Sequence, residues 1–349
     1  MNNKQKVESS ASTSFVSACG DFDENSFLVE DIEICDLELD RVIGEGAWGT
    51  VWHAIDPITK ISYAVKVVSK YSLLKNKQQE HAKREREIMP QLDHPFIVKL
   101  KKFSQDKRCI YFIQEFVNGG EFKTFVKRNR RLNKELYQGS FYAAQIAMTL
   151  SYLHSEGIIY RDLKPENMMM DQQGYLKLID FGLSKKITGD GRSGKTMTMC
   201  GTPNYIAPEV ILNKGYSFQA DWWSFGVVLY EIFYGQMPFE GDTPFDLCKS
   251  IIKDKPNFSK KIDDKLNLLI KGLLRKDPRK RYGAKKILEN KFFKDTDYKA
   301  IFTKDMEAPF RPSVESSNDT KYFKKIMFPK VNEANSPELH PREDIFKHW

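Results

Sequence analysis

The sequence lacks long apolar segments, clustered cysteines and internal repeats. No apolar run approaches the roughly 18 residues that a membrane-spanning helix needs, and no signal-peptide pattern follows Met1. Asn2 stands where N-myristoylation requires glycine. The five cysteines are odd in number, scattered and without the spacing of zinc ligands, which indicates a reducing compartment. We therefore expect no membrane span and a cytoplasmic location, with the nucleus as an alternative.

The chain also lacks a concentrated block of positive charge, although it is basic overall. Its 55 lysines and arginines outnumber 47 aspartates and glutamates, which gives a formal net charge of +8. These cations are spread along the chain without interleaved aromatic side chains, so we expect no nucleic-acid partner. At 349 residues and 41% hydrophobic content, the chain can bury a large core, which we expect to be divided between two lobes.

Two polar motifs in the middle of the chain carry the strongest chemical signal. Residues 160–167 read YRDLKPEN, and residues 180–182 read DFG. In this spacing Asp162 can accept the proton of an attacking hydroxyl, while Asn167 and Asp180 supply the hard oxygen ligands that Mg²⁺ prefers. The motifs therefore predict phosphoryl transfer from a nucleotide to a hydroxyl, with ATP and Mg²⁺ as cofactors.

A glycine-rich segment, residues 44–51 (GEGAWGTV), lies between the predicted strands 37–43 and 51–55. Glycines at such a hairpin tip permit a tight turn and let backbone N–H groups approach phosphate oxygens. The same spacing occurs in dinucleotide-binding folds, but those require a helix directly after the glycines, and here a strand follows. The predicted nucleotide contacts in this segment are Gly44, Glu45, Gly46, Gly49 and Val51.

Lys66 falls inside the apolar predicted strand 63–68, where an ammonium group needs a neighbouring anion. The basic stretch 75–89 is predicted to be a helix, and Glu85 on it is the expected partner, so that the ammonium points at the α- and β-phosphates. Glu87 competes for this role. The alternative is a lysine that reaches solvent and a solvated helix glutamate.

Together these motifs resemble those of a eukaryotic protein kinase, over roughly residues 36–349. The segments 198–203 (TMCGTP), 221–224 (DWWS) and 307–310 (EAPF) are similar to those of the AGC group, above all the cyclic-AMP- and cyclic-GMP-dependent kinases. The resemblance implies an α+β bilobal fold, with an antiparallel sheet and one main helix in the small lobe, a larger helical lobe and an AGC-type C-terminal tail. The implied boundaries are 1–35 for a flexible N-terminal segment, 36–117 for the small lobe, 118–293 for the large lobe and 294–349 for the tail.

The resemblance also implies how ATP would be bound. Backbone groups of Glu115 and Val117 would meet adenine, and Phe323 of the tail would reach the same pocket. Gln114 falls at the back of this pocket, where most relatives carry an apolar residue; alternatively, it only bonds neighbouring backbone. Lys164 would balance charge on the transferred phosphate. Further implied contacts are Ala64, Lys66 and Glu121, with Asn167 and Asp180 as the metal ligands.

Periodicity predicts two long helices in the larger lobe. One contains Tyr142, Ile146, Leu150 and Leu153, which recur at helical spacing. The other, 222–234, is apolar nearly all round, and Asp221 is expected to cap it. The resemblance adds that Asp221 holds the backbone of the catalytic loop, and Glu209 is expected to pair with Arg281.

For substrates, the resemblance implies basic peptides. Glu121, Glu166 and Glu231 match carboxylates that, in relatives, bind arginines two and three residues before the phosphoacceptor; ordinary solvation of these acids is the alternative. Asn204 replaces an acid present in some relatives, so a more distant arginine is expected to matter less. The expected pocket for the residue after the acceptor contains Met199, Thr202, Pro203 and Ile206.

Activation is expected to need phosphorylation of Thr198 by an upstream kinase, because Arg161, Lys185 and His81 converge on this position in the family. For His81 the alternative is an ordinary exposed helix residue. The loop 187–195 is longer and richer in glycine than in close relatives. The expected partner is an inhibitory subunit that binds a cyclic nucleotide; otherwise phosphorylation of Thr198 alone would control activity.

The tail carries further regulatory positions by resemblance. Ser336 is a second expected phosphosite, and Phe346 with Trp349 matches the aromatic pair that fills a groove on the small lobe. A stray pair at a frayed terminus is the alternative.

Three functional classes compete on these observations. An active serine/threonine kinase accounts for Lys66, Glu85, Asp162, Asn167 and Asp180 together. A pseudokinase scaffold would lack at least one of these side chains, and none is missing. A small-molecule phosphotransferase of similar fold gives no reason for the peptide-docking acids. We therefore predict a serine/threonine protein kinase.

Overall fold

The computed structural model describes residues 34–46, 49–128, 136–187, 196–198, 200–258, 262–324, 326, 336–340 and 344–349, all within the unit Ile32–Trp349. The segment predicted to be flexible, 1–35, lies almost entirely outside these residues, as do Met199 and most of the loop 187–195. No helix in the described part of the chain is long and apolar enough to cross a membrane.

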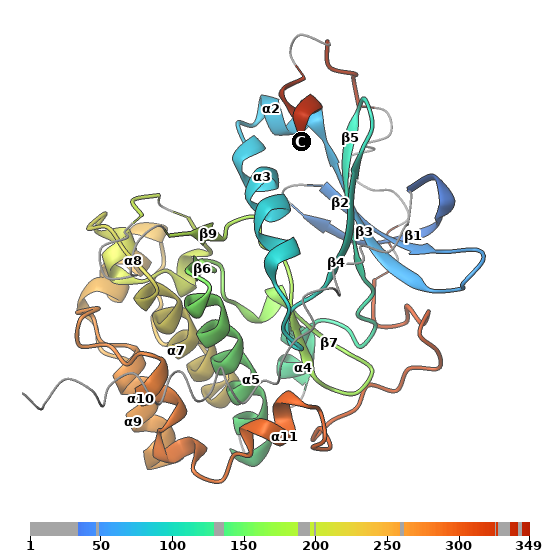
Figure 1. Cartoon of the computed structure of the whole chain (residues 1–349). Helices are drawn as coiled ribbons and strands as arrows, with labels where there is room; N and C mark the ends of the chain where they lie inside the picture. The colour runs from blue at the N-terminus through green and yellow to red at the C-terminus, as the bar shows by residue number, and fades with distance from the viewer. Residues whose placement is uncertain are drawn as a thin grey trace, which may run out of the picture. The chain divides into compact units, whose positions relative to one another are not determined.

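The small lobe is built on a five-stranded antiparallel sheet, shown in blue to green in Figure 1. In spatial order its strands are β1 (Glu38–Gly46), β2 (Gly49–Ile55), β3 (Ser62–Ser69), β5 (Cys109–Glu115) and β4 (Leu100–Gln105). Side chains alternate along β3, so Val65 and Val67 join one apolar cluster and Val68 joins a second. Lys66 shares the face of Val68, which is the face covered by helix.

Two helices lie on that face, where the sequence predicted one helix over 75–89. They are α2 (Lys70–Lys75) and α3 (Gln79–Ile88). The helix predicted over 75–89 is confirmed as α3, but it begins later, because Lys77 adopts the left-handed region, with φ of 55°, and separates α3 from α2. On α3 the buried positions recur every three residues and include a carboxylate: Ala82, Glu85 and Ile88.

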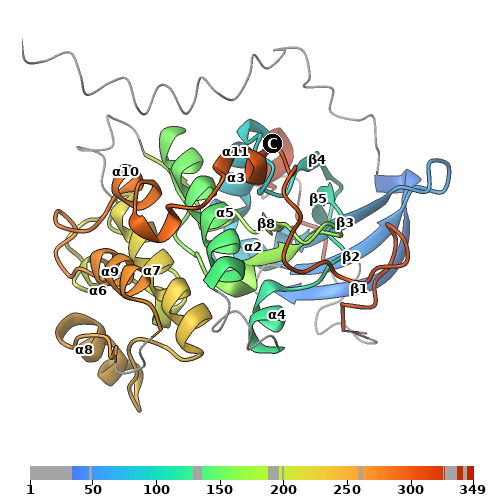
Figure 2. The ribbon, with the colours of Figure 1, turned by 90° about the horizontal axis from the view of Figure 1, so that it is seen from below.

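The larger lobe is mostly helical, with α5 (Leu136–Ser155) and α7 (Gln219–Tyr234) packed together at its centre (Figure 2). α7 is buried along nearly its whole length, as its apolar sequence predicts. The four residues predicted to line the first helix are all buried on α5. The remaining helices are α4 (Phe122–Arg128), α6 (Pro208–Ile211), α8 (Pro244–Lys253), α9 (Asp264–Leu273), α10 (Ala284–Leu288) and α11 (Tyr298–Phe302).

Short elements between the long helices carry the polar motifs. The two-stranded sheets pair β6 (Ile158–Ile159) with β9 (Lys185–Lys186) and β7 (Met168–Met170) with β8 (Leu176–Leu178). The 3₁₀ turns are η1 (Ile34–Asp36), η2 (Met89–Gln91), η4 (Pro165–Asn167), η5 (Pro203–Tyr205), η6 (Lys291–Phe293) and η8 (Ile345–His348). The expected α+β architecture, with a small sheet lobe and a larger helical lobe, is therefore confirmed.

A buried ion pair in the larger lobe joins Glu209 and Arg281, as predicted. Arg281 Nη1 and Nη2 lie 2.6 and 2.8 Å from the two carboxylate oxygens of Glu209. The guanidinium also donates to the carbonyl of Gln219 and lies 5.2 Å from the ring of Trp223. Because both groups are buried and fully matched, removing one partner would cost about 3–5 kcal/mol of stability.

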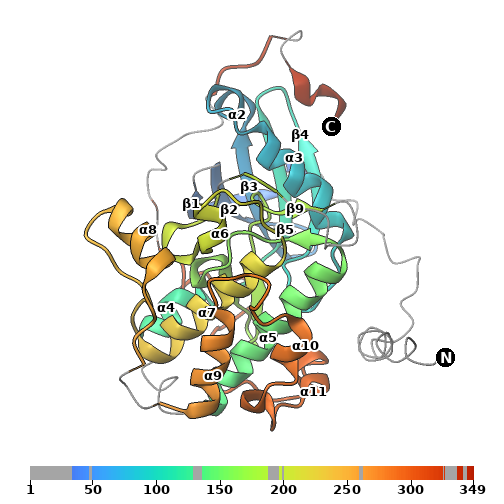
Figure 3. The same cartoon turned by 90° about the vertical axis from the view of Figure 1, so that its left-hand side faces the viewer.

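The tail returns from the larger lobe to the small lobe. Phe323 lies against Phe116, with ring centroids 5.4 Å apart, and Ile326 forms a bridge to β1. In Figure 3 the C-terminal segment lies beside α2, where Lys70 pairs with Asp344 at 3.0 Å. Phe346 is fully buried in the cluster that contains Val68, and its ring lies 4.7 Å from that of Trp349. These aromatic side chains are packed rather than frayed.

Candidate active site

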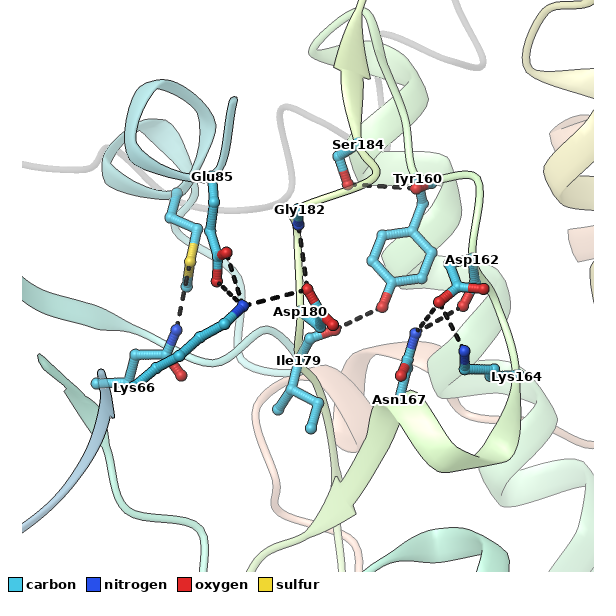
Figure 4. Close-up of polar contacts among 12 residues, drawn as sticks. Lys66, Glu85, Tyr160, Asp162, Lys164, Asn167, Ile179, Asp180, Gly182 and Ser184 are labelled. Atoms are coloured by element: carbon cyan, nitrogen blue, oxygen red, sulfur yellow. Dashed lines mark hydrogen bonds and ion pairs between the residues drawn. The ribbon is translucent and has the colours of Figure 1, made fainter. Parts of the chain in front are cut away.

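Lys66, Glu85 and Asp180 form one group of ion pairs that joins the two lobes (Figure 4). Lys66 Nζ lies 2.8 Å from Glu85 Oε2 and 3.5 Å from Asp180 Oδ1. Glu85 is buried whereas Glu87 is exposed, so Glu85 is the partner of the lysine. Burial opposes the charge on Lys66, but Asp180 and Glu85 outweigh it and raise the pKa of the ammonium above its usual range. Lys66 is therefore a permanent cation at this position.

Asp180 begins the DFG segment in a strained backbone conformation, with φ of 60°. Its Oδ1 accepts a hydrogen bond of 3.2 Å from the N–H of Gly182. Burial works to raise the pKa of Asp180, but the ammonium of Lys66 and the Gly182 N–H outweigh it and lower that pKa. Phe181 anchors the segment, since it is buried against the ring of Tyr160 at 5.4 Å. Asp180 is thus presented as a carboxylate.

Asp162 is oriented by three side chains. Lys164 Nζ lies 2.7 Å from its Oδ2, and Asn167 Nδ2 donates to the same oxygen at 2.8 Å (Figure 4). Thr202 Oγ1 donates to Oδ1 at 3.0 Å and lies 2.7 Å from Lys164 Nζ. The sequence placed Thr202 only in the substrate pocket, and its bond to Asp162 could not be read from the separation of the two residues along the chain. The carboxylate is held in one orientation.

Asp221 does not cap α7, contrary to the prediction. The helix begins earlier, with Phe218 at the N-cap, so Asp221 is buried in the first turn with its oxygens toward the catalytic loop. It accepts hydrogen bonds from the backbone N–H groups of Tyr160 at 2.9 Å and Arg161 at 2.8 Å. His154 Nε2 lies 2.8 Å from the same carboxylate. These bonds fix Arg161, whose φ is 72°, and they match the anchoring that the resemblance implied.

The residues expected to bind Mg²⁺ fit that ion by their donor chemistry. Asn167 directs Nδ2 to the backbone oxygen of Asp162 at 2.9 Å and to Oδ2 at 2.8 Å, which leaves its Oδ1 as a ligand. Asp180 adds a carboxylate, the other oxygen donor that Mg²⁺ prefers. Among the described residues, no group of three His, Cys, Asp or Glu side chains could hold a metal by itself. Nucleotide phosphates and water would therefore complete the coordination.

The glycine-rich segment forms the turn between β1 and β2. Gly46 pairs with Gly49 across the turn, and the two residues between them lie outside the described part of the chain. Gly49 has φ of 151°, and a Cβ there would lie 2.1 Å from the carbonyl oxygen of Val67. The segment therefore needs glycine to cross β3 closely. The other predicted contacts pair in register, Gly44 with Val51 and Glu45 with Thr50.

The expected adenine contacts lie where β5 leaves the sheet. Glu115 Oε1 accepts from Lys177 Nζ at 2.7 Å, so its side chain links the small lobe to β8, and its backbone N–H donates to the carbonyl of Lys99 at 3.0 Å. Gln114 is buried, and its Nε2 donates to the sulfur of Met89 at 3.5 Å rather than to neighbouring backbone. Ala64 pairs with Gln114 across the sheet, and Val117 is buried beyond the strand.

A hydrogen-bonded relay that the sequence did not reveal joins the tail to the sheet. His53 on β2 lies 3.0 Å from Asp40 through Nδ1 and 2.8 Å from Ser62 Oγ through Nε2. Ser62 Oγ in turn donates to Asn318 Oδ1 of the tail at 2.8 Å. The His53 ring lies 4.6 Å from that of Phe116, which contacts the tail aromatic at the expected adenine pocket. The relay thus supports that pocket from behind.

The predicted peptide-docking acids are not equivalent. Glu121 is exposed just before α4. Glu166 forms an ion pair with Lys123, a residue that the sequence analysis did not single out. Tyr205 donates to Glu231 at 2.6 Å. Burial raises the pKa of Glu231, the hydrogen bond from the Tyr205 hydroxyl opposes this increase, and the negative charge of Glu166 adds to it.

Thr198 lies on an exposed segment that is joined to the catalytic loop. Its carbonyl accepts a hydrogen bond of 2.6 Å from Tyr216, and Arg161 Nη1 donates to the same hydroxyl at 3.5 Å. Arg161 is itself buried, and its Nη2 has no hydrogen-bond partner in the described part of the chain. The arginine next to Asp162 is therefore close to the expected phosphosite and has an unused donor.

The other two expected phosphate-binding cations occupy neighbouring elements. Lys185 Nζ donates to Thr196 Oγ1 at 3.3 Å. Burial lowers the pKa of His81 on α3, and the positive charges of Arg84 and Arg161 lower it further. His81 therefore shares a cationic region with Arg161. Of the remaining predicted positions, Pro203 begins η5, Ile206 follows it and Ser336 is buried.

Comparison with known proteins agrees with this geometry. The protein kinase domain matches residues 37–293. The cGMP-dependent protein kinase of Eimeria tenella is 42% identical over 293 residues, which are 81% of this chain and 28% of that protein. The cAMP-dependent protein kinase catalytic subunit 3 of Drosophila melanogaster is 36% identical, over 82% of this chain and 49% of that protein. The RAC family serine/threonine-protein kinase homolog of Dictyostelium discoideum is 34% identical, over 90% of this chain and 71% of that protein.

The chain thus spans less than a third of the Eimeria kinase and about half of the Drosophila catalytic subunit. The domain match covers the five-stranded sheet, the catalytic loop and the helical lobe. All three relatives are AGC kinases. The chain belongs to the protein kinase family, in its AGC group of serine/threonine kinases.

Proposed function

We propose that this chain transfers the γ-phosphoryl group of ATP to serine or threonine hydroxyls in proteins that carry arginines before the phosphoacceptor. The observation that carries the proposal is the orientation of Asp162 by Lys164, Asn167 and Thr202. A carboxylate fixed in this way can accept the proton of a hydroxyl within hydrogen-bond reach. Removal of that proton accompanies the attack of the hydroxyl oxygen on phosphorus.

The other side chains position the nucleotide and balance charge. Lys66, held between Glu85 and Asp180, directs its ammonium to the α- and β-phosphates. Lys164 lies beside Asp162 and balances negative charge on the transferred group. As the oxygen–phosphorus bond forms, the bond from phosphorus to the bridging oxygen breaks, and ADP leaves with the electron pair.

Asn167 and Asp180 would hold Mg²⁺ through oxygen atoms. When bound, the ion neutralises charge on the nucleotide phosphates and orients them. The contribution of the chain is to keep both oxygens in place: Asn167 by its bonds to Asp162, and Asp180 by its bond to Gly182.

Basic substrates are proposed because acids gather beside the catalytic loop. Glu166 is two residues from Lys164, and it lies close enough to Glu231 to affect the ionisation of that residue. Guanidinium groups bind such carboxylates through charge-assisted hydrogen bonds. Glu121 offers a third, exposed acid at the start of α4.

Control is proposed to come from phosphorylation of Thr198 by an upstream kinase. The unused donor of Arg161 and the nearby cations would bind a phosphate and order the segment. Ser336 is proposed as a second phosphosite; because it is buried, the tail would have to open before modification.

A second layer of control is proposed from an inhibitory subunit that responds to a cyclic nucleotide in the cytoplasm. Two relatives are named for dependence on cyclic nucleotides, which supports this partner. An arginine-rich segment of the subunit would occupy Glu121, Glu166 and Glu231. Co-purification from the native source, followed by addition of cyclic nucleotide, tests the partner; an active monomer that no subunit inhibits would leave Thr198 as the only control.

The direct test of the activity is ATP-dependent labelling of an arginine-containing serine peptide by the purified chain. We expect labelling by the wild type and none by the Asp162→Ala variant. ATP binding without transfer to any acceptor would instead identify a pseudokinase scaffold. Labelling of small hydroxyl compounds but of no peptide would identify a small-molecule phosphotransferase.

A further inference from the structure

Lys123 pairs with one of the acids that the sequence predicted to bind a basic substrate. It is on α4 (Figure 1), which packs against the turn Pro165–Asn167 of the catalytic loop. Its ammonium forms an ion pair with Glu166 Oε1, and both side chains are only about three-tenths exposed, at 29% and 30%. One of the acids that matches a peptide-docking position in relatives is therefore already paired with a cation of the same chain.

The other oxygen of this carboxylate is shielded from solvent and unpaired among the described residues. Glu166 Oε2 is buried and has no hydrogen-bond partner in the described part of the chain. An unpaired buried carboxylate oxygen is costly, and a donor from a ligand would relieve that cost. One carboxylate oxygen of Glu166 is therefore bound by Lys123, and the other is buried without a hydrogen-bond partner among the described residues.

The positive charge of α4 also reaches the second acid. Lys123 and Lys127 are four residues apart, so they share one face of the helix. Both oppose the increase in the pKa of Glu231 that its burial produces. Lys123 and Lys127 therefore act as counter-ions of Glu166 and Glu231. They weaken the attraction of these two acids for a basic substrate.

We propose that Lys123 is a specificity-determining residue that competes with a basic substrate side chain for Glu166. The inference rests on the proposed function. It adds that arginine in the substrate improves kcat/KM less at one peptide position than at the other. A bidentate arginine needs both oxygens of a carboxylate, and with Lys123 in place Oε1 is occupied and Oε2 is buried. Arginine at the position served by Glu166 therefore gains less than arginine at a position served by Glu121.

The test uses two pairs of serine peptides. The two peptides of a pair differ only in carrying arginine or glutamine at one position, which is two residues before the serine (−2) in one pair and three residues before it (−3) in the other. We call the arginine effect the kcat/KM of the arginine peptide divided by that of the glutamine peptide in the same pair. In Glu166→Gln, the position that loses its arginine effect is the one served by Glu166. At that position, Lys123→Met and Lys123→Gln should both raise the arginine effect by about three- to tenfold, with no change at the other position.

Two controls separate this role from a general change of charge. Lys285→Met removes an exposed lysine from α10 of the same lobe and should leave both ratios unchanged. In the double variant with Glu166→Gln, Lys123→Met should have no further effect, because its partner is gone. Equal arginine effects in wild type and in both Lys123 variants, or an equal rise at both positions, would overturn the inference and leave the kinase activity standing. Failure to phosphorylate any of the four peptides would overturn the proposed function together with the inference.

Discussion

Asn167 directs its side-chain amide to Asp162, at 2.9 Å to the backbone oxygen and at 2.8 Å to the carboxylate. One residue thereby orients the expected proton acceptor and keeps its own carbonyl oxygen out of these bonds, as a ligand for the expected metal. The two functions are coupled because an amide has donors on one side and an acceptor on the other. A movement of Asn167 would therefore change both the orientation of Asp162 and the position of the expected metal ligand.

The first prediction concerns Asp162. Asp162→Asn should lower kcat by about 10²–10⁴-fold, because an amide cannot take up the hydroxyl proton. The dissociation constant for ATP should change little, since Lys66 and Asp180 are untouched. Steady-state kinetics and nucleotide titration measure the two quantities. An equal loss of ATP binding would argue against a role for Asp162 as the base.

The second prediction concerns Lys66. Lys66→Met removes the cation between Glu85 and Asp180, which leaves two carboxylates without their counter-ion. Productive ATP binding and turnover should fall together, by more than about tenfold in kcat/KM for ATP. Lys285→Met is the matched control, because it makes the same side-chain change on an exposed helix. Unchanged turnover in Lys66→Met would refute the assignment.

The third prediction concerns Thr198. Thr198→Ala should reduce kcat/KM for a peptide by at least about tenfold relative to the phosphorylated wild type, because no phosphate can pair with Arg161. Mass spectrometry establishes the phosphorylation state of the wild-type sample before the kinetic comparison. Met197→Ala, at the exposed neighbouring position, tests whether the effect belongs to Thr198. Full activity in Thr198→Ala would exclude the switch.

The fourth prediction concerns the relay to the tail. Asn318→Ala removes the acceptor of the Ser62 hydroxyl, a bond worth about 1 kcal/mol. We expect KM for ATP to rise by about two- to tenfold with little change in kcat, because the relay supports Phe116 and not the reacting groups. Asn318→Asp keeps the acceptor and should restore KM. Ser62→Ala removes this bond and also the bond to His53, so it should raise KM for ATP at least as much as Asn318→Ala; an unchanged KM in both variants would show that the relay does not support Phe116.

The fifth prediction is a pH dependence of stability from His94. Burial lowers the pKa of His94 to about 3, and the charge of Lys177 adds to this. Its Nδ1 accepts from the N–H of Phe96 at 3.2 Å, and its ring stacks on that of Tyr152 at 5.0 Å, both consistent with the neutral form. Because the folded pKa lies below the ordinary value of about 6.5, the unfolded chain binds more protons between these two values.

Stability should therefore fall as pH decreases below about 6.5, by up to about 1.4 kcal/mol per pH unit from this group. Above pH 6.5 the contribution should be constant. Denaturant unfolding of wild type and His94→Asn between pH 4 and 7.5 measures it. The variant is less stable overall, but its slope below pH 6.5 should be smaller; equal slopes would contradict the prediction.

Much of the active site could be predicted from spacing along the chain. Asp162 and Asn167 share one turn of the catalytic loop, and Asp180 follows the β7–β8 hairpin that begins directly after Asn167, so this geometry follows from local structure. The position of Lys66 in an apolar strand predicted that it needs an anion, and helical periodicity predicted the buried centre of the larger lobe. The Glu209–Arg281 pair was expected from resemblance and is present.

The sequence-based predictions were least accurate at the ends of helices, which depend on backbone conformation and tertiary contacts. Asp221 has the residue type of a helix cap, but the helix starts two residues before it, and its oxygens bind the catalytic loop instead. The helix predicted over 75–89 begins only at Gln79, because the left-handed backbone at Lys77 separates it from α2, a break that side-chain periodicity does not report.

Several functional contacts belong to the tertiary structure alone. Thr202 reaches Asp162, Lys123 reaches Glu166, and Ser62 reaches Asn318, and each contact joins residues that are 40 or more positions apart. The sequence by itself determined which chemical groups are present and which local turns present them. Only the folded chain decided which distant donors meet those groups, because packing of the lobes and the tail, and not sequence separation, sets these distances.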